Sequence, residues 1–303
     1  MDPLTGFLAA AVRIGTPLAW AALGETIGER AGVINLAVEG SMLAGCLAAT
    51  LATVGLGDPW LGVVAGLVAG ALITALFAAV AIWGRTDQII AGTALTLASI
   101  GITGVIYRQA LHGVGTGLSV ATFPTVDVPF LHAIPVVGPA VFEQPVLTYL
   151  VILAVPLVWW ILFRTTAGLR LRAAGESAEA ARAAGVDVRR IQTIAVVVGG
   201  AMAGVAGATL VLAQVGSFAE RMTAGRGFIA IAIVVLGRWH PAGVLLAALG
   251  FGAANAIQFA FQAMGLSVPY QFFLMLPYLL ALVALTGVVG WVRAPDGLGK
   301  LVH

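Results

Sequence analysis

The sequence predicts an all-α protein, a single domain over residues 1–303 built as a bundle of about nine membrane-spanning helices. Hydrophobic residues make up 60% of the chain, charged residues only 9%, and the mean hydropathy is +1.05. A water-soluble domain has about a quarter of its residues charged, because its surface faces water. The net charge of +2 and the single cysteine, Cys46, argue against a nucleic-acid-binding protein and against a disulfide scaffold.

Long apolar runs identify the expected spans, because a hydrocarbon core about 30 Å thick needs roughly 20 apolar residues per helix. The expected spans are residues 7–23, 33–53, 60–83, 89–107, 145–163, 191–213, 227–239, 242–264 and 272–292. The span at 227–239 is too short for a full helix, so we expect a short helix joined to irregular backbone there.

Arginines set the expected orientation, since basic residues in short loops stay on the cytoplasmic side. Six of them lie in the loop 164–190, namely Arg164, Arg170, Arg172, Arg182, Arg189 and Arg190. Placing this loop in the cytoplasm puts the loop 108–144 and the N-terminus outside and the C-terminus inside. A re-entrant loop at 227–239 would instead move the C-terminus outside.

Glu39 is the one acid well within an expected span. A charge near the centre of a membrane costs at least about 2.5 kcal/mol, so such a residue normally faces a cavity or a partner. Asn35 precedes Glu39 by one helical turn and shares its face. We predict that both line a solute pathway; in the alternative, Glu39 lies near the cytoplasmic end of its helix and pairs with Arg30.

Two further sets of polar residues share helical faces inside expected spans. The first is Thr93 with Thr96, and the second is Asn255 with Gln258 and Gln262. These side chains could hydrogen-bond a hydroxylated solute along a pathway, or they could join neighbouring helices. Residues 30–34 and 226–229 also look alike, and interrupted helices at corresponding positions of two halves suggest an inverted repeat around a central site.

Within the loop 164–190, Ser177 and Gly185 bracket an alanine-rich stretch. Serine is a favoured N-cap and glycine commonly follows the end of a helix, so we predict a short surface helix from Ser177 to Ala184. With an acid at Glu179 and a base at Arg182, this helix is suited to docking into a groove of another protein. The alternative is an ordinary connector.

The sequence contains no catalytic constellation, no Gly-x-x-x-x-Gly-Lys phosphate loop and no metal-binding spacing. His112, His132, His240 and His303 all fall in expected loops or at the terminus. We therefore expect a transporter without catalytic residues, metal or cofactor.

Four separated stretches have a recognisable pattern. They are ERAGVINLAVEGSMLAG at 29–45, EAARAAG at 179–185, MTAGRGFIA at 222–230 and GRWHP at 237–241. They resemble permease subunits of bacterial ABC importers in the branched-chain amino acid, ribose and nucleoside permease superfamily. The Asn-x-x-x-Glu-Gly-x-Met pattern that begins at Asn35 is most similar to the nucleoside or simple-sugar branch. One departure is Thr96, which stands where that family often has asparagine.

The resemblance implies a half-channel in the bacterial cytoplasmic (inner) membrane. Its implied partners are a second permease subunit, identical or homologous, ABC ATPase subunits that hydrolyse ATP, and an external binding lipoprotein or periplasmic protein. The residues expected along the pathway are Asn35, Glu39, Thr93, Thr96, Phe228, Asn255 and Gln258. The residues expected to contact the ATPase are Glu176, Glu179, Ala180, Ala181, Arg182 and Gly185.

The expected solute is a nucleoside or a related sugar-containing molecule. A branched-chain amino acid or a free pentose is the alternative within the same superfamily. An ion-coupled secondary transporter is the alternative from another class, and it would need a coupling site in the membrane, for which Glu39 is the clear acid available.

Overall fold

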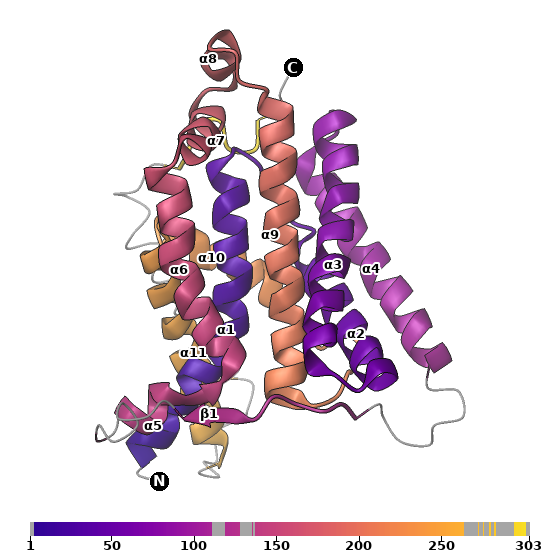
Figure 1. The fold of residues 1–303 in the computed structure, drawn as a ribbon, viewed down its shortest axis with the longest axis vertical. Coiled ribbons are helices and arrows are strands. Elements are labelled where there is room, and N and C mark those ends of the chain that lie inside the picture. The colour runs from indigo at the N-terminus through magenta and orange to yellow at the C-terminus, as the bar shows by residue number, and fades with distance from the viewer. Residues whose placement is uncertain are drawn as a thin grey trace.

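The computed structural model describes residues 3–110, 119–127, 135, 137–263, 272, 275, 279, 282 and 294–300, and its helices form a bundle (Figure 1). The long helices are α1 (Pro3–Arg30), α2 (Val38–Leu56), α3 (Pro59–Ala78), α4 (Gln88–Ala110), α6 (Val146–Arg164), α9 (Val188–Leu210) and α11 (Pro241–Ala263). The shorter elements are α5 (Val137–Phe142), α7 (Thr166–Glu176), α8 (Ala178–Ala183), α10 (Arg226–Leu236), the strands β1 (Thr125–Asp127) and β2 (Glu143–Pro145), and the π-helical turns η1 (Ala79–Trp83) and η2 (Val211–Val215).

Among the described residues, seven helices are long and apolar enough to cross a membrane, and α10 is a shorter apolar helix. These eight correspond to the first eight predicted spans, so the prediction of a polytopic helical bundle is confirmed. The ninth predicted span, 272–292, lies outside the described residues except at four positions.

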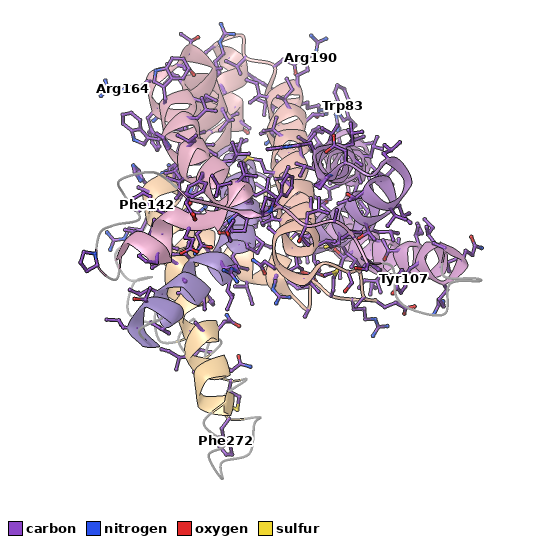
Figure 2. All side chains as sticks on the ribbon, turned by 60° about the horizontal axis from the view of Figure 1, so that its bottom comes forward. Trp83, Tyr107, Phe142, Arg164, Arg190 and Phe272 are labelled. Atoms are coloured by element: carbon purple, nitrogen blue, oxygen red, sulfur yellow. The ribbon has the colours of Figure 1, made fainter. Side chains whose placement is uncertain are left out.

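The bundle has two distinct ends. We call the end formed by residues 164–190 the α8 end; the described C-terminal residues 294–300 also lie there, whereas the N-terminus lies at the opposite end (Figure 1). Figure 2 shows Arg164, Arg190 and Trp83 at the α8 end and Phe272 far from them. The short β1–β2 pair and α5 lie at the opposite end.

Helix α9 is central, because it packs against α1, α2 and α3. Glycines allow this close approach. A Cβ added to Gly45 of α2 or to Gly70 of α3 would lie 2.7 Å from the Cα of Gly204 on α9. Lipid provides no hydrophobic drive between helices, so close packing of small residues is a main source of their association. Three helices thus meet at one glycine.

Helix α1 is longer than the predicted span 7–23, since it continues to Arg30. The prediction ended at the charged residues after Leu23, but Glu25 and Glu29 are only 1% and 2% exposed. Their carboxylates accept hydrogen bonds from other segments, which is what allows acids to remain inside the bundle.

Residues 216–236 form an interrupted crossing, the second along the chain, and it agrees with the prediction of a short helix plus irregular backbone. After η2 ends at the opposite end, residues 216–225 return into the bundle without helix. Helix α10 then leads toward the α8 end, since Trp239 just after it accepts from Arg30 at the end of α1. Its 11 residues span roughly 16 Å, about half of the hydrocarbon thickness. The chain therefore crosses here, and the re-entrant alternative does not apply.

Candidate functional site

The first broken crossing lies between α1 and α2, where residues 31–37 lack regular helix although most of them are buried. Backbone groups at membrane depth need partners, because lipid offers none. Side chains supply them: Gln192 Nε2 donates to Ala31 O (3.1 Å), Ile34 N to Gln88 Oε1 (2.9 Å), Thr96 Oγ1 to Leu36 O (2.9 Å) and Ala37 N to Asn35 Oδ1 (3.1 Å). Side chains of α4 and α9, together with Asn35 itself, thus provide hydrogen-bond partners for this irregular segment.

Asn35 lies within this segment and is 2% exposed. Its Nδ2 donates to Glu25 Oε1 at 3.1 Å, while its Oδ1 caps the backbone of Ala37. Asn35 therefore joins the broken segment to α1. Its predicted helical turn shared with Glu39 is not formed, since α2 begins only at Val38.

Glu39 lies in the first turn of α2 and is 5% exposed. Its carboxylate accepts hydrogen bonds from Thr223 Oγ1 (2.6 Å), Gly225 N (2.9 Å) and Gly227 N (2.7 Å). The last two groups belong to the start of α10, where unpaired N–H groups and the helix dipole favour an anion. Glu39 therefore has a partner, but this is the α10 N-terminus and not Arg30. The starts of both interrupted helices meet here inside the bundle.

Gly227 has to be small at this junction, since a Cβ on it would lie 2.6 Å from both the Cα and the N of Glu39. The next residue, Phe228, is 43% exposed. On the other side of α2, Thr96 is 3% exposed and bonded to Leu36, whereas Thr93 is exposed and donates to Ile89 O. Of these predicted pathway residues, Thr93 and Phe228 therefore reach the surface of the chain.

The predicted polar set of Asn255, Gln258 and Gln262 belongs to α11. Asn255 is half-buried and donates to Phe251 O at 2.9 Å, and Gln258 is 5% exposed. Helix α11 packs most extensively against α1 and also contacts α10 and α6. The side chain of Gln262 lies outside the described residues. The structure thus brings Asn35, Glu39, Thr96 and Phe228 into one region and leaves the α11 residues apart.

Sequence reasoning missed two buried acids of α1. Glu29 Oε2 accepts from Trp239 Nε1 at 2.5 Å, and Arg30 Nε donates to Trp239 O at 3.0 Å. Within the described residues, Glu25 Oε2 and Glu29 Oε1 have no hydrogen-bond partner. Their i, i+4 spacing on a run with Leu23 and Ile27 was the available signal, because it places both acids on one helical face. Glu39 is thus not the sole acid inside a span.

At the α8 end, the predicted short helix is observed as α8. Ser177 Oγ accepts from Ala180 N at 3.3 Å, and Gly185 after the helix has φ +81°, so both predicted boundaries are confirmed. Glu179, Ala180 and Arg182 are exposed, whereas Ala181 is buried. The loop also contains a second helix, α7, with Glu176 as its last residue, which the prediction of a single helix omitted.

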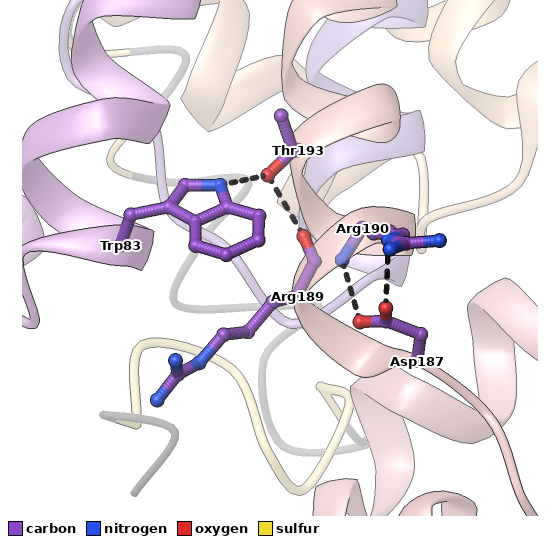
Figure 3. Close-up of polar contacts among 5 residues, drawn as sticks. All are labelled: Trp83, Asp187, Arg189, Arg190 and Thr193. Carbon is purple, nitrogen blue, oxygen red and sulfur yellow. Dashed lines mark hydrogen bonds and ion pairs between the residues drawn. The ribbon is translucent and has the colours of Figure 1, made fainter.

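Helix α9 begins directly after this loop. Asp187 accepts from Arg190 N and forms an ion pair with Arg190 Nε at 2.9 Å (Figure 3). One turn further on, Trp83 Nε1 donates to Thr193 Oγ1 at 3.0 Å, which joins the end of η1 to α9 (Figure 3). The start of α9 is thereby fixed relative to its neighbours.

The C-terminal residues connect the loop to the first broken crossing. Gly297 N donates to Gly175 O (2.9 Å), and Gly299 N donates to Gly32 O (3.0 Å). Gly175 in turn lies against Gly32, since a Cβ on Gly175 would come 3.0 Å from Gly32 N. Helix α7 is therefore in direct backbone contact with the start of residues 31–37.

The chain is similar to known membrane permeases along most of its length. A family model described as branched-chain amino acid transport system permease component matches residues 7–285. The guanosine ABC transporter permease protein NupQ of Bacillus subtilis is 35% identical over 93% of this chain and 92% of its own. The nucleoside ABC transporter permease protein NupC of Lactococcus lactis is 33% identical over 94% and 92%. TsgC13 of Haloferax volcanii, whose name proposes a glucose ABC transporter permease, is 41% identical over 88% and 81%.

Among solved structures, an ABC transporter described as metal-chelate type, in an inward-facing conformation, has a TM-score of 0.53 with 13% identity. The match covers 93% of this chain and 85% of that one, and it supports the fold alone. Together with the seven candidate spans, the relatives identify a multi-pass protein of the cytoplasmic membrane. The match over most of the chain and the relatives above 30% identity show that this protein belongs to the permease component family of branched-chain amino acid transport systems.

Proposed function

We propose that this chain is the membrane-spanning subunit of an ATP-driven importer, and that its solute is a nucleoside or a related sugar-containing molecule. The observation that carries the proposal is the similarity along nearly the whole chain to permeases named for guanosine and nucleosides. The relative named for glucose supports the sugar-containing part of the solute class.

The proposed assembly has two permease subunits, ABC ATPase subunits and an external binding protein. The sequence has no phosphate-binding loop of its own, so ATP hydrolysis belongs to a separate subunit. The external lipoprotein or periplasmic protein delivers the solute at the end opposite to α8. The whole assembly, rather than this chain alone, then performs transport.

The proposed docking element for the ATPase is α8, with Glu176 of α7 and Gly185 beside it. Glu179 and Ala180 face outward, while Ala181 anchors the helix in a small apolar cluster with Ala174 and Val188. A movement of α8 on ATP binding passes through α7 and Gly175 to the first broken crossing, by the contacts described above.

Docking at α8 can be tested by steric block. Glu179→Trp adds bulk to the exposed face, and we expect the ATPase to be lost on co-purification while membrane insertion is retained. The matched control is Ile90→Trp, a substitution at a residue 66% exposed on α4. Normal ATPase association of the Glu179 variant would contradict docking at α8.

For the pathway, we propose that Thr93 and Phe228 face it, whereas Asn35, Glu39 and Thr96 position the segments behind them. The support is exposure: Phe228 directly follows the junction of Glu39 with α10 and leaves its side chain free. A second permease subunit facing this region would close the pathway. A role for Asn255 and Gln258 stays a prediction.

Phe228→Ala tests this assignment. We expect uptake to fall severalfold through a changed KM or maximal rate, with unchanged amounts of folded protein, since Phe228 is 43% exposed. Leu246→Ala, at a residue 70% exposed on α11, is the control and should transport normally. Equal uptake by both variants would remove Phe228 from the pathway.

The solute itself is tested by uptake in cells with and without the gene, using labelled nucleosides, pentoses, glucose and branched-chain amino acids. We expect the deletion to abolish nucleoside uptake, and we expect ATP depletion to do the same in cells that carry the gene. If the deletion abolishes uptake of another solute instead, the protein transports that solute, and the proposed importer assembly still holds. Uptake insensitive to ATP but sensitive to an ion gradient would contradict the importer, and Glu25, Glu29 and Glu39 would then be the acids to examine.

A further inference from the structure

A groove lies at the α8 end between α1, α6, α7 and α9, and its volume is about 330 Å³. Its wall is formed by apolar side chains that include Ile27 of α1, Ile161 of α6, Leu171 of α7, and Ile194 and Val198 of α9. This volume is within the roughly 300–1,000 Å³ typical of small-molecule sites. None of its lining residues belongs to the junction of Glu39 with α10.

Arg170 is the charged residue of this groove. Other arginines of the same loop are occupied: Arg172 Nε donates to Leu162 O at 3.0 Å, Arg164 lies 5.3 Å from the Trp159 ring centroid, and Arg190 pairs with Asp187. Arg170, in contrast, makes no hydrogen bond, ion pair or ring contact with any residue that the structure describes. A positive charge without a partner therefore borders an apolar groove.

The positions of the lining residues along α9 give the depth of the groove relative to the α8 end. Its lining residues on this helix run from Ile191 to Val198, and α9 itself begins at Val188 at the α8 end. At 1.5 Å per residue, the groove covers roughly the first 5 to 15 Å of the span. That is the depth at which the upper part of an acyl chain lies when its headgroup is at the surface.

The chemistry of the lining excludes a nucleoside or a sugar as the occupant. Each hydroxyl of such a solute would be buried among aliphatic side chains without a hydrogen-bond partner, at a cost of about 1–3 kcal/mol per group. A hydrocarbon chain has no such cost. Basic residues beside pockets between spanning helices are suited to anionic lipid headgroups.

We propose that the groove binds an anionic phospholipid of the leaflet at the α8 end, with one acyl chain against α9 and the phosphate at Arg170. The lipid would connect α6 and α9, the two spans that flank the docking loop, and would support the orientation of α7. This inference does not depend on which solute the protein transports.

Native mass spectrometry of the purified full chain tests the proposal. Phosphatidylglycerol and phosphatidylcholine with identical acyl chains are added in turn, and retention of each lipid is measured. We expect preferential retention of phosphatidylglycerol, about fivefold weaker retention in Arg170→Gln, and near-normal retention in Arg170→Lys, since one surface cation contributes about that much. Arg85→Gln is the matched control, because Arg85 is an exposed arginine at the turn before α4, outside the groove.

Ala167→Trp provides a second variant, which fills the groove and leaves Arg170 in place. We expect it to lose retention of both lipids. Equal retention of the two lipids by the unmodified protein, or the same loss in Arg85→Gln as in Arg170→Gln, would overturn the proposal. Disulfide cross-linking of an Ala167→Cys variant to a second copy of the chain, in place of lipid retention, would overturn it as well.

Discussion

At the scale of single residues, the carboxylate of Glu39 accepts from three donors of a segment that follows it by more than 180 residues. Glu39→Ala would leave a hydroxyl and two backbone N–H groups unpaired inside the bundle. At about 1–3 kcal/mol for each buried unsatisfied group, we expect a loss of at least about 3 kcal/mol of stability. The thermal unfolding midpoint of the purified protein in detergent measures this loss.

Glu220→Ala is the comparison, because Glu220 pairs with Arg108 at the surface, with side chains 43% and 63% exposed. Exposed ion pairs contribute about 0–1 kcal/mol, so this variant should melt close to the unmodified protein. Equal melting of the Glu39 and Glu220 variants would mean that the α10 N-terminus is satisfied in some other way.

Whether the sequence predicts the partner of a buried acid depends on how far apart the two residues are along the chain. The cost of a charge in a membrane indicated that Glu39 faces a cavity or a partner, and the structure gives it a partner. The partner was unpredictable, because no local spacing relates residue 39 to residues 223–227. The same holds for Glu25 and Glu29, whose burial depends on Asn35 and on Trp239.

At the scale of elements, α2, α3 and α9 converge on Gly204. Gly204→Val would overpack this site, because even an added Cβ would lie 2.9 Å from the carbonyl carbon of Gly66. Overpacking of this kind costs about 1–3 kcal/mol, so we expect a lower unfolding temperature and less protein in the membrane. Fluorescence-detected size-exclusion chromatography after heating measures both.

Gly101→Val is the control, since Gly101 is exposed on α4 and a Cβ there meets nothing within 4 Å. It should change stability by less than about 0.5 kcal/mol. If both glycine variants behave alike, close packing at Gly204 does not limit stability.

Elements were predictable where one local property decides them. Length and apolarity identified eight spans, and Ser177 with Gly185 identified α8. The errors arose where distant contacts decide: α1 continues past Leu23 because its acids find partners elsewhere, and α2 starts late because side chains of other segments hold residues 31–37 open.

At the scale of the whole molecule, the arginine distribution predicts that the α8 end faces the cytoplasm. A cysteine introduced at Ser177 should react with a membrane-impermeant reagent only from that side, and one at Thr122 only from the other, since both residues are exposed and lie at opposite ends. Cys46 is buried and should not interfere. If the impermeant reagent labels Ser177→Cys in intact cells, the α8 end faces outside and the predicted orientation is wrong.

The bonds from Gly297 to Gly175 and from Gly299 to Gly32 have a consequence for biosynthesis. The ribosome makes the chain from its N-terminus, so the first two helices are inserted long before residues 297–299 exist. The carbonyl of Gly32 can accept this hydrogen bond only after residue 299 has been made. A chain that stops before residue 297 would therefore contain nearly every span but would leave the carbonyls of Gly175 and Gly32 without these two donors.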